Sequence, residues 1–484
     1  MDELDILTIG KRSAHGILAL ISRTFFLSII SFVSSLVIFT VLTPLDLGIY
    51  TAAIAGQRII SFFTDFGFGA ALIQKKESLE KKELKTVFSV QVIATLFLFV
   101  VVVVFRDQIA NFFQLGEKAL RLFLVLVFLI FLSSFKIIPS ILLEREIHFQ
   151  KLIIPQIIES FIFNAILVIL VLLGYGIDSY SFAFLVSAFI GIPFYYFVSP
   201  WKISFGIDKQ SLKHLHFGAQ FQAKNILAAV KDDLLTVYLA KTLSFVDLGY
   251  IGFGQRNAFF AYRFIVDNVT KVTFSTYARM QDDLKLLKSV IEKSLFLVSS
   301  AIFPLLFGLI IVAPYIILYF PKWQQKWEPA IISLTFFSLN AAVSSISGIL
   351  VTVLDATGRV RQTLYLMILW TAATWIITPI SISLFGYNGV AVTSFLITLT
   401  ISITVYLVKK IVNFRFFSSI YKPLFCSVVM SVFVFLTAKM FVANFISLGI
   451  IIMLGAVVYI SLMSFFAKEI REDIKQLIKS YEKK

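Results

Sequence analysis

Charged side chains lie inside stretches of this sequence that are otherwise apolar enough to cross a membrane. The cations are Arg23, Arg58, Lys136, Lys224, Lys231, Arg256, Arg263 and Lys271, and the anions are Asp65, Glu159, Asp232, Asp233 and Asp267. Each such charge costs about 2.5–3.5 kcal/mol at a helix centre, so these residues usually bind ligands, ions or one another. Eight cations less five anions leave a surplus of three positive charges. Because guanidinium groups bind phosphate oxygens in a bidentate way, this surplus predicts a site for an anion that carries phosphate or carboxylate groups.

The spacing of these residues indicates that several of them share a helix face. Lys224 and Lys231 are seven residues apart, which is two helical turns or about 10 Å. Arg256 and Arg263 are also seven residues apart. Asp267 follows Arg263 by four residues, and Lys271 follows Asp267 by four. A carboxylate between two cations on one face neutralises them in part. A purely structural role for this ladder is the second interpretation.

Each charged position has a predicted role. The residues expected to bind the anionic group are Arg23, Arg58, Lys224, Lys231, Arg256 and Arg263. The candidates for coupling to H⁺ or Na⁺ are Asp233, Asp267 and Glu159. Asp232 and Asp233 point about 100° apart on a helix, so at most one of them faces a given direction. A second interpretation of Glu159 is a protonated carboxyl that packs between helices. Lys136 and Lys271 lie near predicted cytoplasmic helix ends, where the ammonium group reaches the membrane interface.

No residue pattern indicates covalent chemistry. The sequence lacks a P-loop, a nucleophile elbow and an HExxH motif, which excludes ATP hydrolysis by this chain. Its single cysteine, Cys426, cannot form an intrachain disulfide, and its four histidines are not spaced as zinc ligands. We therefore expect a protein that is not an enzyme and that holds no metal or cofactor besides a coupling H⁺ or Na⁺.

The elements that position the charges are membrane-spanning helices. Of the 484 residues, 59% are hydrophobic and 15% are charged, against about 45–50% and 25% in soluble domains. A spanning helix uses about 20 residues, so the apolar residues suffice for roughly fourteen. The predicted spans are residues 18–42, 46–72, 86–105, 119–140, 153–173, 179–199, 216–241, 248–275, 293–313, 330–353, 362–384, 389–408, 423–441 and 445–466. All the buried charges except Lys136 and Glu159 lie on the first, second, seventh and eighth of these spans.

Basic residues are distributed unequally between the two sides of the membrane. With the N-terminus inside, the cytoplasmic segments hold 28 Lys and Arg residues, and the opposite loops and helix ends hold seven. This bias predicts that both termini are cytoplasmic, in the inner membrane of a bacterium. It also accounts for the net charge of +15, so nucleic acid is not an expected partner. Residues 467–484 have the pattern of an amphipathic helix on the inner membrane face.

The chain resembles itself at an offset of about 200 residues. Residues 42–48 (LTPLDLG) recur as 243–249 (LSFVDLG), and residues 173–176 (LGYG) recur as 385–388 (FGYN). Copies separated by an even number of spans have the same orientation in the membrane. The predicted architecture is an all-α integral membrane protein of fourteen helices, with two parallel-repeat six-helix lobes around a central cavity. The N-terminal lobe is predicted over residues 1–200 and the C-terminal lobe over residues 201–410. Residues 411–466 form the two appended spans, and residues 467–484 form the amphipathic helix.

Four segments resemble the bacterial polysaccharide transporters of the Wzx type, in the multidrug/oligosaccharidyl-lipid/polysaccharide (MOP) exporter superfamily. These segments are residues 42–50 (LTPLDLGIY), 63–74 (FTDFGFGAALIQ), 143–149 (LEREIHF) and 277–283 (YARMQDD). The resemblance covers essentially the whole chain. It implies a flippase that carries an undecaprenyl-pyrophosphate-linked oligosaccharide across the bilayer by alternating access, for O-antigen, capsule or exopolysaccharide. The polysaccharide polymerase or assembly machinery is then a candidate partner.

The sequence is also similar to the lipid II flippases, whose cavity arginines lie on spans 1, 2 and 8. In this sequence Arg23, Arg58 and either Arg256 or Arg263 occupy comparable helices. Lipid II is therefore an alternative cargo. A cation-coupled multidrug exporter is disfavoured by the positive surplus. An O-antigen polymerase or ligase is a third alternative, but such enzymes need a large outer loop, and the longest here has about 16 residues.

Overall fold

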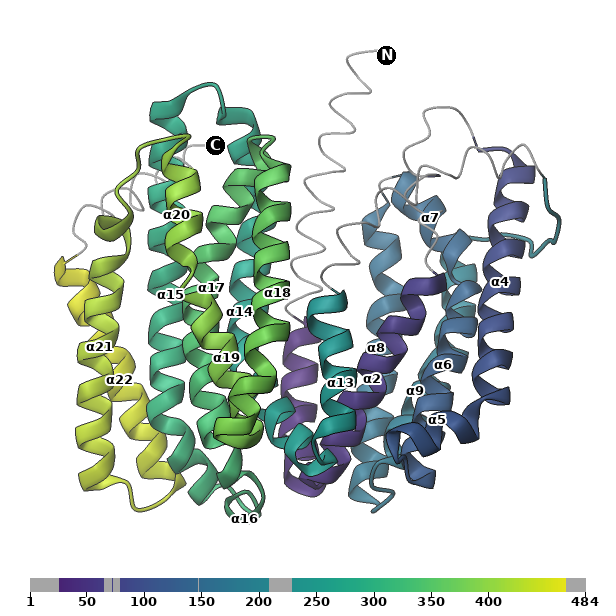
Figure 1. Cartoon of the computed structure of the whole chain (residues 1–484), viewed down its shortest axis with the longest axis horizontal. Coiled ribbons are helices and arrows are strands. Elements are labelled where there is room, and N and C mark those ends of the chain that lie inside the picture. Colours follow the sequence, from purple (N-terminus) through teal and green to yellow (C-terminus); the bar gives the residue numbers. More distant parts are fainter. Residues whose placement is uncertain (1–25, 65–71, 73–78, 147, 209–228, 467–484) are drawn as a thin grey trace. The chain divides into compact units, whose positions relative to one another are not determined.

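The computed structural model describes residues 26–64, 72, 79–146, 148–208 and 229–466 (Figure 1). These residues are helical or lie in the connections between helices, and no strand occurs among them. The chain divides into two compact units, Met1–Gly249 and Tyr250–Lys484. The predicted positions Arg23, Asp65 and Lys224 and the amphipathic helix 467–484 lie outside the described residues.

The first unit is a bundle of helices around α6. After a helix described over Phe26–Val41, its elements are α2 (Pro44–Thr64), α4 (Lys81–Val104), α5 (Arg106–Phe113), α6 (Glu117–Ser134), α7 (Ile137–Arg145), α8 (Phe149–Leu172), α9 (Asp178–Val198), the π-helix η1 (Val230–Leu234) and α13 (Leu235–Thr242). Helix α6 packs against α2, α4 and α9, and α8 packs along α9. Helix α2 also contacts η1 and α13, which brings two charged segments of the chain together.

The second unit is built on α15 and α17. Its elements are α14 (Phe245–Met280, whose first residues belong to the first unit), α15 (Leu284–Tyr319), α16 (Gln324–Trp327), the 3₁₀ turn η2 (Glu328–Ala330), α17 (Ile331–Ala356), α18 (Val360–Phe385), the 3₁₀ turn η3 (Gly386–Asn388), α19 (Gly389–Thr398), α20 (Ile401–Lys409), α21 (Phe416–Phe441) and α22 (Phe445–Phe466). Its main core joins buried residues of α14, α15 and α17. Helices α21 and α22 pack together on α15.

The helical membrane class is confirmed. Eight helical stretches in the described residues are long and apolar enough to cross a membrane, or nine if the bent pair α6 and α7 crosses as one span. Helices α2 and α14 are 21 and 36 residues long but are not among these eight, because charged and polar residues lower their mean hydropathy. The predicted number of fourteen spans and the division into two lobes stay predictions.

The predicted span over residues 119–140 consists of two helices, α6 and α7, between which the chain bends by 51°. Pro139, in the first turn of α7, has no N–H to donate to the carbonyl four residues before it. That carbonyl belongs to Phe135, and it accepts a hydrogen bond from the Tyr196 hydroxyl at 2.8 Å instead. The bend is therefore stabilised by a side chain from α9. The predicted span 389–408 is also interrupted, between α19 and α20.

The two copies of the repeated segment have the same local structure. In the first copy, the hydroxyl of Thr43 donates to the carboxylate of Asp46 at 2.7 Å, and the Asp46 N–H donates back to that hydroxyl at 3.2 Å. In the second copy, Ser244 and Asp247 make the same two bonds at 2.7 and 3.2 Å. These reciprocal bonds cap the starts of α2 and α14. The sequence repeat is thus, at this place, a repeated helix-capping motif.

The glycines of the repeat allow these two helix starts to touch within the first unit. A Cβ built on Gly48 would lie 1.6 Å from the carbonyl oxygen of Phe245, and one on Gly249 would lie 1.9 Å from that of Pro44. Because Phe245 and Pro44 occupy equivalent positions in the repeat, the contact is reciprocal, as across a two-fold axis. Only glycine permits backbones to approach this closely.

Candidate functional site

A charged cluster lies where α2 meets the π-helix η1 in the first unit. Arg58 Nη1 lies 3.3 Å from Asp233 Oδ1, and the Asp233 side chain is 18% exposed whereas that of Arg58 is 61% exposed. The π-helix places one extra residue in a turn, a distortion that occurs often at functional sites. The guanidinium group therefore holds Asp233 at one end and presents its remaining donors outward, where a second anion can reach them.

The neighbouring carboxylate points elsewhere, as the helical geometry predicts. Lys231 Nζ lies 2.6 Å from Asp232 Oδ1, and the Asp232 side chain is 64% exposed. Asp233 thus faces α2, whereas Asp232 pairs with its own neighbour along the chain. An exposed pair of this kind contributes little to stability. Both Arg58 and Lys231, which the sequence indicates as anion ligands, have a carboxylate beside them.

The two charges outside the main charged helices pair with each other. Lys136, at the bend between α6 and α7, forms an ion pair with Glu159 of α8. The Lys136 side chain is only 16% exposed, and its ammonium group lies 5.6 Å from the centre of the Tyr195 ring. Gly191 makes room for the carboxylate, because a Cβ there would lie 3.1 Å from Glu159 Cδ. Lys136 therefore does not extend to the interface as expected, and coupling at Glu159 stays a prediction.

Helix α14 has one packed face and one charged face. Val266, Thr273 and Tyr277 are buried, whereas the residues of the predicted ladder are exposed. These residues are Arg263, Asp267 and Lys271. The positive charges of both flanking cations act on the Asp267 carboxylate, as the spacing of four residues predicts. Arg256, two turns earlier, is half-buried.

Helix α14 carries a net positive charge. The ion pairs Arg58–Asp233, Lys231–Asp232 and Lys136–Glu159 each sum to zero. The other charges predicted within spans that the structure describes are Arg256, Arg263, Lys271 and Asp267, all on α14. Three cations less one anion leave a net charge of +2 along this single helix. A low-dielectric surface with such a surplus attracts anions.

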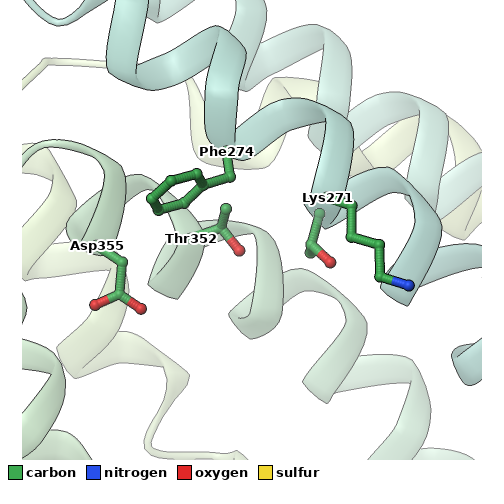
Figure 2. Close-up of a pocket in the computed structure, with 5 residues that line it drawn as sticks. Lys271, Phe274, Thr352 and Asp355 are labelled. Atoms are coloured by element: carbon green, nitrogen blue, oxygen red, sulfur yellow. The ribbon is translucent and has the colours of Figure 1, made fainter. Parts of the chain in front are cut away.

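A pocket of about 430 Å³ lies beside the last residues of this ladder. Its lining residues are Thr270, Lys271 and Phe274 of α14 and Thr352 and Asp355 of α17. Figure 2 shows Asp355 at one side and Lys271 at the other, with Phe274 and Thr352 between them. The sequence analysis does not identify Thr352 and Asp355, which lie about eighty residues after their α14 neighbours. The one signal in the sequence is a carboxylate, Asp355, close to the end of a predicted span.

Metal binding receives no support from the described residues, where no three His, Cys, Asp or Glu side chains are grouped suitably. The charged features of the described residues are an arginine–aspartate pair in the first unit and, in the second, a helix of net positive charge beside a pocket.

Comparison with solved structures identifies the fold. The fold matches "Lipid II flippase MurJ, inward closed conformation" with a TM-score of 0.75 at 18% identity, over 93% of this chain and 99% of that one. It also matches an inward-facing multidrug resistance MATE family transporter of the MOP superfamily, with a TM-score of 0.63 at 14% identity, over 81% of this chain and 98% of that one. The chain therefore has the fold of the MOP-superfamily transporters, as the resemblance predicts.

The chain belongs to the family described as "Polysaccharide biosynthesis protein", whose model matches residues 15–332. It is 22% identical over 382 residues to the teichuronic acid biosynthesis protein TuaB of Bacillus subtilis, covering 77% of each chain. It is 24% identical over 302 residues to the succinoglycan biosynthesis transport protein ExoT of Rhizobium meliloti, covering 62% of this chain and 60% of that one. A membrane protein in the cps region of Klebsiella pneumoniae is 23% identical over 351 residues, covering 69% of each chain. The prediction of a multi-pass helical membrane protein is confirmed. One of these relatives and both solved structures are named as transporters or flippases, which agrees with the prediction of a transporter rather than an enzyme.

Proposed function

We propose that this protein is a flippase for an undecaprenyl-pyrophosphate-linked oligosaccharide, the repeat unit of an O-antigen, capsule or exopolysaccharide. It works by alternating access in the bacterial inner membrane, with both termini in the cytoplasm. The observation that carries the proposal is the net positive charge of α14, in a chain of the polysaccharide biosynthesis family with a MOP-superfamily fold. No bond of the substrate is broken; the protein moves its charged and polar headgroup across the membrane.

The diphosphate is bound by the arginines of α14. Arg256 and Arg263 are seven residues apart, so they lie about 10 Å from each other on the same side of the helix. Guanidinium groups there bind phosphate oxygens through charge-assisted hydrogen bonds, which are stronger when water is excluded. Arg58, in the first unit, is proposed as a separate phosphate ligand, which exchanges Asp233 for a phosphate oxygen. The polyprenyl tail stays in the lipid.

The charge balance distinguishes this function from export of cationic drugs. A cationic substrate is bound by acidic residues, whereas α14 carries four cations and only two carboxylates, Asp247 and Asp267. A cationic drug there would meet like charges, which raises its free energy in the site. The MATE-like fold therefore serves an anionic cargo in this chain.

Removal of a single guanidinium tests this proposal. The variants Arg256→Ala and Arg58→Ala each lose hydrogen bonds to a charged group, so we expect surface glycan to fall about tenfold or more. Surface glycan is measured by immunoblot or by flow cytometry, and membrane insertion by the amount of protein in the membrane fraction.

Lys439→Gln is the matched control, because Lys439 is an exposed cation at the end of α21. This variant should export glycan at the wild-type level. Wild-type surface glycan in both arginine variants, at equal protein levels, contradicts the proposed binding roles.

A further inference from the structure

The pocket between α14 and α17 offers a mixture of groups that suits neither a diphosphate nor a lipid tail. It combines an ammonium group, a carboxylate, two hydroxyls and one aromatic ring, from the five residues shown in Figure 2. A diphosphate would be repelled by Asp355, and a Na⁺ ion or cationic drug by Lys271. The lining is mainly apolar, but an isoprenoid chain would leave the charged groups of Lys271 and Asp355 at its edges without hydrogen bonds. The remaining class of ligand is a neutral or near-neutral polar molecule.

The hydrogen bonds already made in the pocket define what its ligand must supply. The Thr270 hydroxyl donates to the Val266 carbonyl at 2.9 Å, and the Thr352 hydroxyl donates to the Gly348 carbonyl at 2.8 Å. Each threonine oxygen has therefore used its single proton and keeps its lone pairs as acceptors. The pocket consequently presents acceptors to a ligand.

The carboxylate adds to these acceptors. Asp355 Oδ1 accepts a hydrogen bond from Thr363 Oγ1 at 2.8 Å, which orients the group, and a carboxylate has about four acceptor sites in all. Phosphate at neutral pH has few protons to donate to such a surface. Sugars, in contrast, donate through every hydroxyl and through any amide N–H.

The remaining lining also fits a sugar. The Phe274 side chain is 47% exposed and offers a ring face to the C–H groups of a pyranose, while Lys271 donates to a sugar oxygen. A volume of about 430 Å³ lies in the range of small-ligand sites, about 300–1,000 Å³.

The position of the pocket along α14 fits the order of groups in a lipid-linked glycan. Lys271 follows Arg263 by eight residues, which is about 12 Å along the helix axis. A chain of a few sugars spans that distance from a diphosphate held at the arginine. The pocket also lies toward the ends of α14 and α17 that have basic residues, with Arg279 in the last turn of α14 and Arg359 just after α17. This is the side predicted to be cytoplasmic.

We propose that this pocket is a subsite for a sugar residue of the cargo, an inference that rests on the proposed flippase function. The α14 arginines hold the diphosphate, and the α14–α17 pocket holds part of the glycan. The pocket thus lets the protein select its cargo by sugar as well as by charge.

Separate probes for the two parts of the cargo test this subsite. The full-length protein in lipid nanodiscs is titrated with the oligosaccharide repeat unit freed from lipid and phosphate by mild acid hydrolysis, and with undecaprenyl pyrophosphate that bears no sugar. We expect Thr352→Val and Asp355→Asn each to weaken repeat-unit binding about tenfold or more, because a donor of the ligand loses its acceptor. Binding of undecaprenyl pyrophosphate should stay at the wild-type value.

The chain offers a matched control on the same helix. Thr335 also donates its hydroxyl to a backbone carbonyl four residues earlier, that of Ile331, at 2.9 Å, but does not line the pocket. Thr335→Val should bind both probes as the wild type does. This control separates loss of a pocket acceptor from loss of a hydrogen bond within α17.

Each outcome decides the inference. Wild-type affinity for the repeat unit in both pocket variants, or no binding of the repeat unit by the wild type, overturns the sugar subsite. An equal loss of affinity for both probes in Thr352→Val overturns it as well, because Thr352 would then be needed for folding rather than for sugar binding. If Asp355→Asn does not fold, the test is the comparison of repeat-unit affinity between Thr352→Val and the control Thr335→Val. Wild-type protein that binds the repeat unit but not undecaprenyl pyrophosphate contradicts the flippase proposal and supports the pocket.

Discussion

In the proposed function, an incoming diphosphate competes with Asp233 for the guanidinium group of Arg58. Arg58 Nη1 lies 3.3 Å from Asp233 Oδ1, so a phosphate oxygen that takes this position leaves the carboxylate without its counter-ion. A carboxylate that loses a nearby cation binds H⁺ or Na⁺ more tightly. Because linkage is reciprocal, binding of the coupling ion then favours the form in which Arg58 holds phosphate. We therefore propose that exchange at Arg58 couples the binding of the ion to that of the substrate.

Asp233→Asn tests this coupling, because an amide cannot take up a proton or bind Na⁺ with a full charge. We expect lipid-linked glycan flipping in proteoliposomes to lose its response to an imposed pH or Na⁺ gradient, with a rate that no longer changes when the gradient is reversed. Asp232→Asn is the control, since Asp232 is 64% exposed and pairs with Lys231 rather than with α2. A gradient response of wild-type size in Asp233→Asn would exclude Asp233 as the coupling residue.

At the scale of the helices, the starts of α2 and α14 form a self-complementary contact. Each helix is capped by its own hydroxyl–aspartate pair and presents a glycine to the backbone of the other. Capping bonds satisfy the N–H groups that a helix start leaves unpaired. The glycines remove the side chains that would otherwise separate the two backbones. Both devices occur at equivalent positions of the repeat, so one sequence motif makes both halves of the contact.

Gly48→Ala and Gly249→Ala should each disrupt this contact. The added Cβ would lie 1.6 Å and 1.9 Å from backbone carbonyl oxygens, which no rotamer change relieves. We expect severalfold less folded protein in the membrane and a lower midpoint of thermal unfolding in detergent, measured by fluorescence-detected size-exclusion chromatography.

Gly449→Ala is the matched control, because a Cβ at this helical position of α22 meets nothing within 4 Å. Alanine favours a helix over glycine by about 1 kcal/mol, so this variant should be as stable as the wild type or slightly more so. Unchanged stability in both Gly48→Ala and Gly249→Ala would show that the two helix starts do not pack this closely.

At the scale of the whole molecule, the distribution of basic residues fixes the expected orientation. The cytoplasmic side is predicted to carry 28 Lys and Arg residues against seven on the other side, and such a bias sets the topology of membrane proteins. The orientation decides the direction of the proposed function, since the α14–α17 pocket then lies near the side on which the lipid-linked glycan is made.

Reporter fusions test this orientation. Green fluorescent protein fused after Lys484 should fluoresce, and alkaline phosphatase fused there should be inactive, because the C-terminus is predicted to be cytoplasmic. Alkaline phosphatase inserted after Leu115, in the turn between α5 and α6, should be active. The reversed pattern would invert the proposed direction of transport.

Much of the fold follows from local sequence. Long apolar runs predict helices because backbone groups in lipid must be bonded within the segment, and the residues that begin α8, α9 and α22 lie within a few positions of the predicted starts. The bend at Pro139 was not predicted as such, because proline in the first turn of a helix is also compatible with a straight span. Its outcome depends on Tyr196, which α9 brings to the freed carbonyl.

By itself, the sequence determined that this chain is a helical membrane protein, where its charges lie along each helix, and that its capping motif occurs twice. Periodicity and composition act over a few residues, and each of these properties is local. Only the tertiary structure decided the partners: Arg58 with Asp233 across 175 positions, Lys136 with Glu159, and Lys271 with Asp355 around one pocket. An ion pair or a pocket requires atoms within a few ångströms, and that distance depends on how packed helices are rotated and bent against each other.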